Sequence, residues 1–268
     1  MPKPLIVIKL GGSALTDKAR IYTPRIHTIN SAAKQIAKIR KHYSVIVVHG
    51  AGSYGHIPAR RYGLQNGLKD TKQLKGLTET KLKLLEWERI LDEILRAHGI
   101  PVIPFLASDF ILLRNARIIT ADLGPLSNWL RLGCVPSTGG DIVPDMRDGF
   151  RILSGDQTAA YLAIKFKAKK LIYCVDVDGL FDANPNLNPR AHLMESLTVR
   201  SARGLISRAT RKTTPDVTGG MAGKVREAIA AAKRRIPVYF VNLTRDERLY
   251  KAAVGQRTLC SRIQPANA

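Results

Sequence analysis

Short apolar runs alternate with stretches of helical periodicity along most of the chain. The runs predict buried strands, at residues 5–10, 44–48, 101–106, 134–137, 171–175 and 236–241. Stretches with apolar residues three and four positions apart predict helices, at residues 24–41, 74–98, 123–132, 157–166 and 221–235. Residues 142–153, interrupted by Asp148-Gly149, predict a hairpin. Strands that alternate with helices indicate an α/β protein: a three-layer sandwich with a mainly parallel central sheet, covered by helices on both faces.

Composition is that of an ordinary globular chain. It has 268 residues, of which 45% are hydrophobic, enough for one large domain with a sizeable core. No apolar run reaches the ~18 residues that a membrane helix needs. The first four residues lead directly into the first predicted strand, without the apolar region of a signal peptide. We therefore expect a cytoplasmic protein with no membrane partner.

Three cysteines stand far apart along the chain, at Cys134, Cys174 and Cys260. An odd number without paired spacing argues against a disulfide framework and against a zinc site. Cys134 and Cys174 each belong to an apolar, strand-like run. We interpret both as core residues, because free cysteine is among the most buried residue types.

The net charge of +22, from 43 Lys and Arg against 21 Asp and Glu, indicates an anionic partner. Nucleic acid is one such partner; an anionic small substrate is another. The basic residues are spread along the chain, with one richer stretch at 200–235. There is no helix-turn-helix, zinc-finger or RNP pattern, and aromatic residues, at 6%, are few for single-strand stacking. Nucleic acid is thus disfavoured as the main partner.

Two glycine-rich turns follow the first two predicted strands, at residues 9–13 and 49–56. Adjacent glycines let backbone N–H groups face an anion without a Cβ in the way. Lys9, on the strand before the first turn, can point across it at a phosphate. Taken alone, the first turn is more often a plain tight turn than a phosphate site. In the second turn, the glycines match the dinucleotide spacing G-x-G-x-x-G, but no acidic residue follows a strand ~20 residues later.

Further chemistry-bearing residues accompany these turns. His56 ends the second turn and is either a capping or core histidine, or a donor to a phosphate oxygen. Lys18 follows the first turn and is either a surface residue or a group that neutralises a transferring phosphoryl group. Asp176 ends a predicted core strand. Residues 216–224 form a third glycine-rich turn that opens a helix, which offers N–H donors and a positive dipole end, with Lys224 nearby.

Together these motifs resemble those of the amino acid kinase superfamily, and within it those of the isopentenyl phosphate kinases. The matching segments are 9–13, 16–18, 49–56, 58–59, 62–64, 140–143, 152–156, 176–179 and 216–224. The resemblance implies the amino acid kinase fold in one domain, residues 1–268. An acceptor-binding lobe would cover about 1–168 and a nucleotide-binding lobe about 169–268. It also implies a homodimer.

The resemblance further implies a reaction: ATP and isopentenyl phosphate give ADP and isopentenyl diphosphate, in isoprenoid precursor synthesis by an alternative mevalonate pathway. Dimethylallyl phosphate is a second candidate acceptor. Mg²⁺ would be held largely by phosphates and water, with no metal site of the protein's own. The implied ATP-binding residues are Lys9, Gly11, Gly12, Ser13, Gly52, Asp176, Gly220 and Lys224. The implied acceptor-binding residues are Ala51, His56 and Gly155, and the implied catalytic residues are Lys18, His56 and Lys9.

Three positions depart from the family pattern: Gly139 stands where histidine or another side chain is common, Gln157 where an acid often follows Gly155-Asp156, and Val175 where threonine often precedes Asp176. Two other functions stay open beside the main one: a kinase of the same fold for a nucleoside monophosphate or a fosfomycin-like phosphonate, and a basic nucleic-acid-binding protein. A prenyl tail needs an apolar pocket. Its candidate residues, each of which can equally be a plain core residue, are Leu77, Leu84, Ile142 and Ile152.

Overall fold

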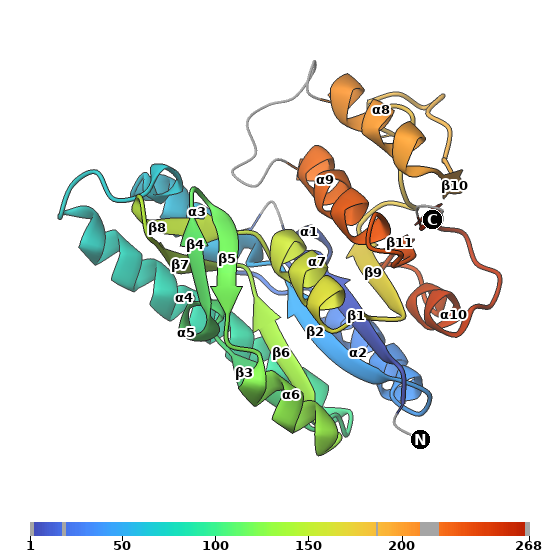
Figure 1. Ribbon diagram of the computed structural model, residues 1–268, viewed down its shortest axis with the longest axis horizontal. Coiled ribbons are helices and arrows are strands. Elements are labelled where there is room, and N and C mark those ends of the chain that lie inside the picture. The colour runs from blue at the N-terminus through green and yellow to red at the C-terminus, as the bar shows by residue number, and fades with distance from the viewer. Residues whose placement is uncertain (1–2, 18–19, 186, 210–219, 266–268) are drawn as a thin grey trace.

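The large sheet is the centre of the molecule in the computed structural model, which describes residues 3–17, 20–185, 187–209 and 220–265. Within these residues it has eight strands, in the order β10-β12-β11-β9-β1-β2-β6-β3 (Figure 1). Their bounds are β1 Leu5–Leu10, β2 Ser44–His49, β3 Val102–Phe105, β6 Val135–Gly139, β9 Lys170–Val175, β10 Ser196–Leu197, β11 Val238–Asn242 and β12 Ser261–Ile263. Among the described strands of this sheet, neighbours pair in parallel except β11 with β12. The predicted mainly parallel sheet is confirmed.

Helices cover both faces of this sheet. On one face, α7 (Gly155–Lys165) and α9 (Gly220–Ala232) pack on Val7 of β1 and its neighbours. On the other face, α2 (Ile26–Ile39), α4 (Gln73–Ala97) and α10 (Arg248–Val254) pack on Ile6 and Ile8. Successive residues of a strand point to opposite faces, so β1 is apolar except for Lys9 because both of its faces are buried. The three-layer sandwich expected from the sequence is confirmed.

A smaller sheet, in the order β5-β4-β7-β8, lies beside the large one (Figure 1). Its strands are β4 Ile111–Arg114, β5 Arg117–Ala121, β7 Asp141–Asp145 and β8 Gly149–Leu153. The antiparallel pair β7–β8 is the predicted hairpin. The second antiparallel pair, β4–β5, was not predicted.

The remaining described helices are short or follow the glycine turns. They are α1 Gly12–Leu15, α3 Gly52–Arg61, the 3-10 turn η1 Leu64–Asn66, α5 Ala107–Phe110, α6 Gly124–Arg131 and α8 Val199–Ala209. The sequence predicted α6 but not the others. In the described part of the chain, no helix is long and apolar enough to cross a membrane.

The two cysteines interpreted as core residues differ in burial. Cys174, in the central strand β9, is fully buried, which confirms the interpretation. Cys134 is only partly buried, so that interpretation was wrong. It lies in the turn between α6 and β6, one residue before the strand begins. The apolar run in the sequence therefore starts before the buried strand does, and its first residue is not part of the core.

Candidate active site

The first two glycine turns lie backbone against backbone at the carboxyl ends of β1 and β2. The two strands are parallel neighbours, and the N–H of Gly50 donates to the carbonyl oxygen of Leu10 at 2.9 Å. A Cβ on Gly50 would lie 2.5 Å from the nitrogen of Gly12, and a Cβ on Gly12 would lie 2.7 Å from the nitrogen of Gly52. No residue with a side chain fits either position without a shift of backbone. The glycines are therefore required by the approach of the two turns to one another.

Thr16 joins the same two turns through its side chain. Its hydroxyl donates to the carbonyl oxygen of Gly12 at 3.0 Å and accepts from the N–H of Ser53 at 3.2 Å.

Four helices begin at the glycines of these and neighbouring turns, at Gly12, Gly52, Gly155 and Gly220. Helix N-termini carry a partial positive charge and N–H groups without intrahelical partners, so the arrangement favours an anion.

A cavity of about 520 Å³ opens between these turns. The site residues expected from the resemblance that line it are Lys9, Gly12, Ser13, Ala51, Gly52, His56, Gly155, Asp176, Gly220 and Lys224. Gly11 does not line the cavity; its N–H donates to the carbonyl oxygen of Cys174 at 2.8 Å, which fixes the turn against β9. Lys18 and residues 210–219, which include most of the third glycine turn, lie outside the described residues.

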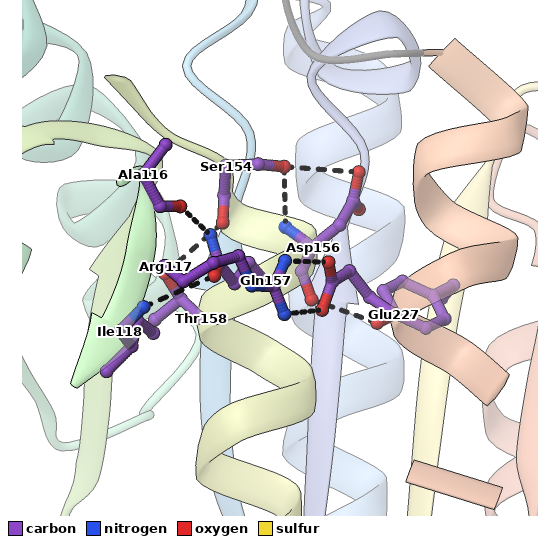
Figure 2. A network of polar contacts seen from close by, with 9 residues as sticks. Ala116, Arg117, Ile118, Ser154, Asp156, Gln157, Thr158 and Glu227 are labelled. Carbon is purple, nitrogen blue, oxygen red and sulfur yellow. Dashed lines mark hydrogen bonds and ion pairs between the residues drawn. The ribbon is translucent and has the colours of Figure 1, made fainter. Parts of the chain in front are cut away.

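Two lysines converge on one carboxylate at one end of the cavity. Lys9 Nζ lies 2.9 Å from Asp156 Oδ1, and Lys224 Nζ lies 3.2 Å from Asp156 Oδ2. Asp156 stands in the first turn of α7, where its N–H donates to the N-cap hydroxyl of Ser154 at 3.1 Å (Figure 2). Asp156 was missed as a site residue, although it follows Gly155 in a segment that carries the resemblance. Its signal was an acid directly after a glycine at a predicted helix start.

Burial and charge act in opposite directions on this cluster. Burial lowers the pKa of Lys9, and the repulsion of Lys224 lowers it too, while the nearby Asp156 raises it; the net direction is down. For Asp156, burial alone would raise the pKa, but the attraction of Lys9 and Lys224 prevails and lowers it. One carboxylate between two ammonium groups leaves a surplus of positive charge. This end of the cavity is therefore electrostatically prepared for a phosphate.

The other end of the cavity combines His56 with apolar side chains. His56 lies on α3 and faces the cavity, together with Leu84 from α4 and with Ile142 and Ile152 from the β7–β8 hairpin. These three apolar residues were candidates for a tail pocket. The fourth candidate, Leu77, does not line the cavity; it packs with the small core cluster around Leu64, Phe150 and Ala59.

An ion pair also belongs to the wall of the cavity. Asp141 lines it at the start of β7, and its oxygens accept from Lys81 Nζ at 2.7 and 2.8 Å. The hydroxyl of Ser108 also accepts from Lys81, at 2.8 Å, and the N–H of Ser108 donates to Asp141. The pair thus attaches α4 and α5 to the hairpin. Neither Lys81 nor Asp141 was predicted as a site residue.

The departure at Gly139 has a steric reason. Gly139 is the register partner of His49 across β6 and β2. A Cβ on Gly139 would lie 2.3 Å from Cε1 of the His49 ring. The glycine therefore leaves room for an imidazole that is almost fully buried behind the second glycine turn.

A family model described as the amino acid kinase family matches residues 4–242, and the chain belongs to this family. Among individual relatives, the isopentenyl phosphate kinase of Methanothermobacter thermautotrophicus is 32% identical over 97% of this chain and 98% of its own length. That of Methanocaldococcus jannaschii is 29% identical over 94% and 96%. A solved structure of an isopentenyl phosphate kinase superposes with a TM-score of 0.84 at 27% identity, covering 97% of this chain and 100% of the other.

Proposed function

We propose that this chain transfers the γ-phosphate of ATP to isopentenyl phosphate, giving ADP and isopentenyl diphosphate. The observation that carries the proposal is one cavity with the charged cluster Lys9–Asp156–Lys224 at one end and His56 beside apolar side chains at the other. A substrate with a phosphate head and a short hydrocarbon tail matches the second end. The full-length similarity to isopentenyl phosphate kinases supports the same assignment.

The donor end is proposed to bind ATP. Lys9 and the N–H groups of Gly12 and Ser13 hold the phosphates, together with the turn at Gly52; Gly11 supports that turn from behind. Asp176, Gly220 and Lys224 contact the nucleotide from the other side. Phosphoryl transfer needs positioning and neutralisation of charge more than covalent help. Asp156 holds both lysines in place and does not itself meet the substrate charge.

The acceptor end is proposed to bind the phosphate of isopentenyl phosphate at Ala51, His56 and Gly155. His56 donates a hydrogen bond to this phosphate and fixes its direction of attack. A phosphate oxygen is already a nucleophile, so the reaction needs no strong general base. Lys18, outside the described residues, is proposed to neutralise charge on the transferring group, and Lys18→Ala should lower kcat more than it changes KM.

Mg²⁺ is proposed to enter with ATP. The ion would be held largely by the phosphates and water, in a cavity that Asp17 and Asp176 also line. When bound, the ion neutralises part of the phosphate charge.

The main test is an ADP-release assay with four acceptors: isopentenyl phosphate, dimethylallyl phosphate, UMP and fosfomycin. We expect turnover with isopentenyl phosphate, slower turnover with dimethylallyl phosphate and none with the other two. A preference for UMP or fosfomycin would replace the proposed acceptor with one of the alternatives. The absence of turnover with both prenyl phosphates would refute the proposal.

We also propose a homodimer, with the acceptor-binding lobe at 1–168 and the nucleotide-binding lobe at 169–268 of each copy. β3 ends the strand order of the large sheet, and its residues Val102, Ile103 and Phe105 are only partly buried. Leu85 on α4 is 44% exposed near this edge. Apolar groups along an open sheet edge favour an interface. Light scattering after gel filtration should give a mass of two chains for the wild type. For Leu85→Asp it should give the mass of one chain.

A further inference from the structure

The tip of the β4–β5 hairpin is attached to two helices that border the cavity, α7 and α9 (Figure 2). Arg117 makes two hydrogen bonds to the carboxylate of Glu227 on α9, from Nη1 to Oε1 at 2.5 Å and from Nη2 to Oε2 at 3.1 Å. On α7, Gln157 donates from Nε2 to the carbonyl oxygen of Ala116 at 3.1 Å and accepts from the N–H of Ile118 at 3.4 Å. One hairpin tip therefore contacts both helices.

The Gln157 contacts explain what the departure at this position provides. An amide side chain carries both a donor and an acceptor, whereas an ionised carboxylate only accepts. Gln157 uses both functions, one on each side of Arg117 in the strand. A glutamate here would set a carboxylate against the carbonyl oxygen of Ala116.

The backbone of the hairpin tip is itself held in place. Asn115 and Ala116 have positive φ angles of 53° and 59°, a conformation that residues other than glycine seldom adopt. The carboxylate of Asp145, on β7, accepts from the N–H of Asn115 at 3.3 Å and from that of Ala116 at 2.8 Å. Asp145 is 3% exposed. Arg117 thus extends from a backbone that a buried carboxylate has fixed.

The ion pair at this tip is unequally buried. The Glu227 side chain is 10% exposed, and that of Arg117 is 58% exposed. Fully exposed pairs contribute little to stability, but a carboxylate that has lost most of its hydration needs its partner. The two parallel hydrogen bonds also restrict direction, because the planar guanidinium matches both carboxylate oxygens at once.

The same two helices meet again one turn away. Lys224 precedes Glu227 by three residues on α9, so both lie on one side of the helix. Lys224 Nζ lies 3.2 Å from Oδ2 of Asp156, and Asp156 is the chain neighbour of Gln157. The hairpin therefore joins α7 and α9 directly beside the contact between Lys224 and Asp156.

We propose that Arg117 is a positioning residue for nucleotide binding: through Glu227 it holds α9 against α7 so that Lys224 stays on Asp156. The proposal rests on the proposed function only in assigning Lys224 to the nucleotide site. Arg117 and Glu227 do not line the cavity, so their effect on the nucleotide passes through Lys224. Acceptor binding at His56 does not depend on this contact.

The test is calorimetric binding of ATP to the purified protein in the absence of acceptor, with KM values measured in parallel. Arg117→Ala should weaken ATP binding about tenfold, the effect of losing a charge-assisted hydrogen bond, and should leave KM for isopentenyl phosphate within about twofold. Arg117→Lys keeps the charge but not the paired geometry and should give an intermediate loss. The reversal Arg117→Glu with Glu227→Arg should recover affinity that each single reversal loses.

The matched control is Lys38→Ala. It removes an ion pair of similar length, Lys38 Nζ to Glu247 Oε1 at 2.8 Å, from helices away from the cavity, and should leave ATP binding unchanged. Melting temperatures show whether each variant is folded. If Arg117→Ala does not fold, the ATP affinity of Arg117→Lys decides the test. Unchanged ATP affinity in a folded Arg117 variant would overturn the proposal. ATP binding without turnover of prenyl phosphates would refute the proposed acceptor and still decide the role of Arg117.

Discussion

Lys9 and Asp156 form an ion pair at the bottom of the cavity, with 2.9 Å between Nζ and Oδ1 and both side chains 4% exposed. A buried ion pair is costly to desolvate. Removing only one of its two charges destabilises a protein more than replacing both with apolar groups, because the remaining charge is then buried without a partner. Its place is explained by the second lysine, Lys224, on the other oxygen of the same carboxylate. Asp156 thus holds two cationic side chains at the place where bound phosphates can supply part of their negative counter-charge.

The first prediction is that Asp156→Asn loses most activity and destabilises the protein by about 3–5 kcal/mol at neutral pH. The buried ammonium group of Lys9 and the partly buried one of Lys224 would then lack a counter-charge, and the pKa of Lys9, which burial already lowers, would fall further. A lysine with a lowered pKa binds fewer protons when folded than when unfolded, so the stability of the variant should rise with pH up to the ordinary value of 10.5. Urea denaturation between pH 6 and pH 9 measures this.

The control for that experiment is Asp246→Asn, which removes an acid whose partner is the exposed hydroxyl of Ser31. We expect stability within about 0.5 kcal/mol of the wild type. If Asp156→Asn shows no steeper rise with pH than this control, then Asp156 does not carry the charge balance of the two lysines.

The second prediction concerns the contact between the glycine turns. Gly50→Ala puts a Cβ 2.5 Å from the backbone nitrogen of Gly12, and backbone cannot move aside as a side-chain end can. We expect a loss of about 1–3 kcal/mol in stability and of most ATP binding, because both turns shift. Gly204→Ala is the control: outside the backbone of its own helix, no atom of the described residues lies within 4 Å of its Cβ, and alanine within α8 should stabilise by up to about 1 kcal/mol. Equal behaviour of the two variants would contradict the steric argument.

The third prediction is that His56→Ala reduces kcat/KM for isopentenyl phosphate by about 10- to 100-fold, the effect of losing a hydrogen bond to a charged group. ATP affinity should stay nearly constant, because the proposed role of His56 is confined to the acceptor phosphate. Steady-state kinetics and ATP calorimetry measure the two effects separately. His42→Ala is the control; this exposed histidine precedes β2, at the end of that strand opposite to the second glycine turn. An ATP affinity that fell as steeply as activity would refute the assignment.

The sequence predicted the sheet and its main helices because their patterns are local. A strand buried on both faces is an apolar run, and a covering helix has apolar residues at regular spacing. The glycine turns and their lysines were predicted for the same reason. Each lies directly after a strand whose end the pattern shows.

Helix α3 was missed because its own residues do not favour a helix. It contains Gly52, Gly55 and Pro58, which indicate a loop when taken alone. Contacts from elsewhere in the chain stabilise it: the Tyr54 ring stacks on Trp87 of α4 with 5.3 Å between centroids, and the Tyr54 hydroxyl donates to the carbonyl oxygen of Tyr22.

The β4–β5 hairpin and Asp156 were missed for a related reason. The hairpin turn uses Ala116 at positive φ, which no turn rule predicts, because Asp145 from another strand stabilises it. The role of Asp156 depends on two lysines that the fold brings from both ends of the chain. A sequence pattern shows that an acid follows a glycine, but not which cations it meets.

The fourth prediction concerns Asp92, which lies on α4 behind the second glycine turn and is 8% exposed. Burial raises its pKa to about 6 from 3.8; the nearby His49 lowers it and Glu88 raises it. A carboxyl whose pKa is raised by folding stabilises the protein fully below the unfolded value of 3.8, and this contribution is lost as the pH rises through 6.

Asp92→Asn should therefore be more stable than the wild type at pH 7.5, by up to about 3 kcal/mol, the equivalent of the pKa difference. The advantage should shrink as the pH falls below 6 and vanish only below the unfolded value of 3.8, where the wild-type carboxyl is protonated in both states. Urea denaturation at several pH values measures the difference. Glu93→Gln, an exposed neighbour on the same helix, should show no such pH dependence. A stability difference that stays constant from pH 4 to pH 8 would contradict this prediction. It would mean that the amide acts through its shape alone, since a steric effect does not depend on pH, and that the ionisation of Asp92 does not destabilise the folded protein.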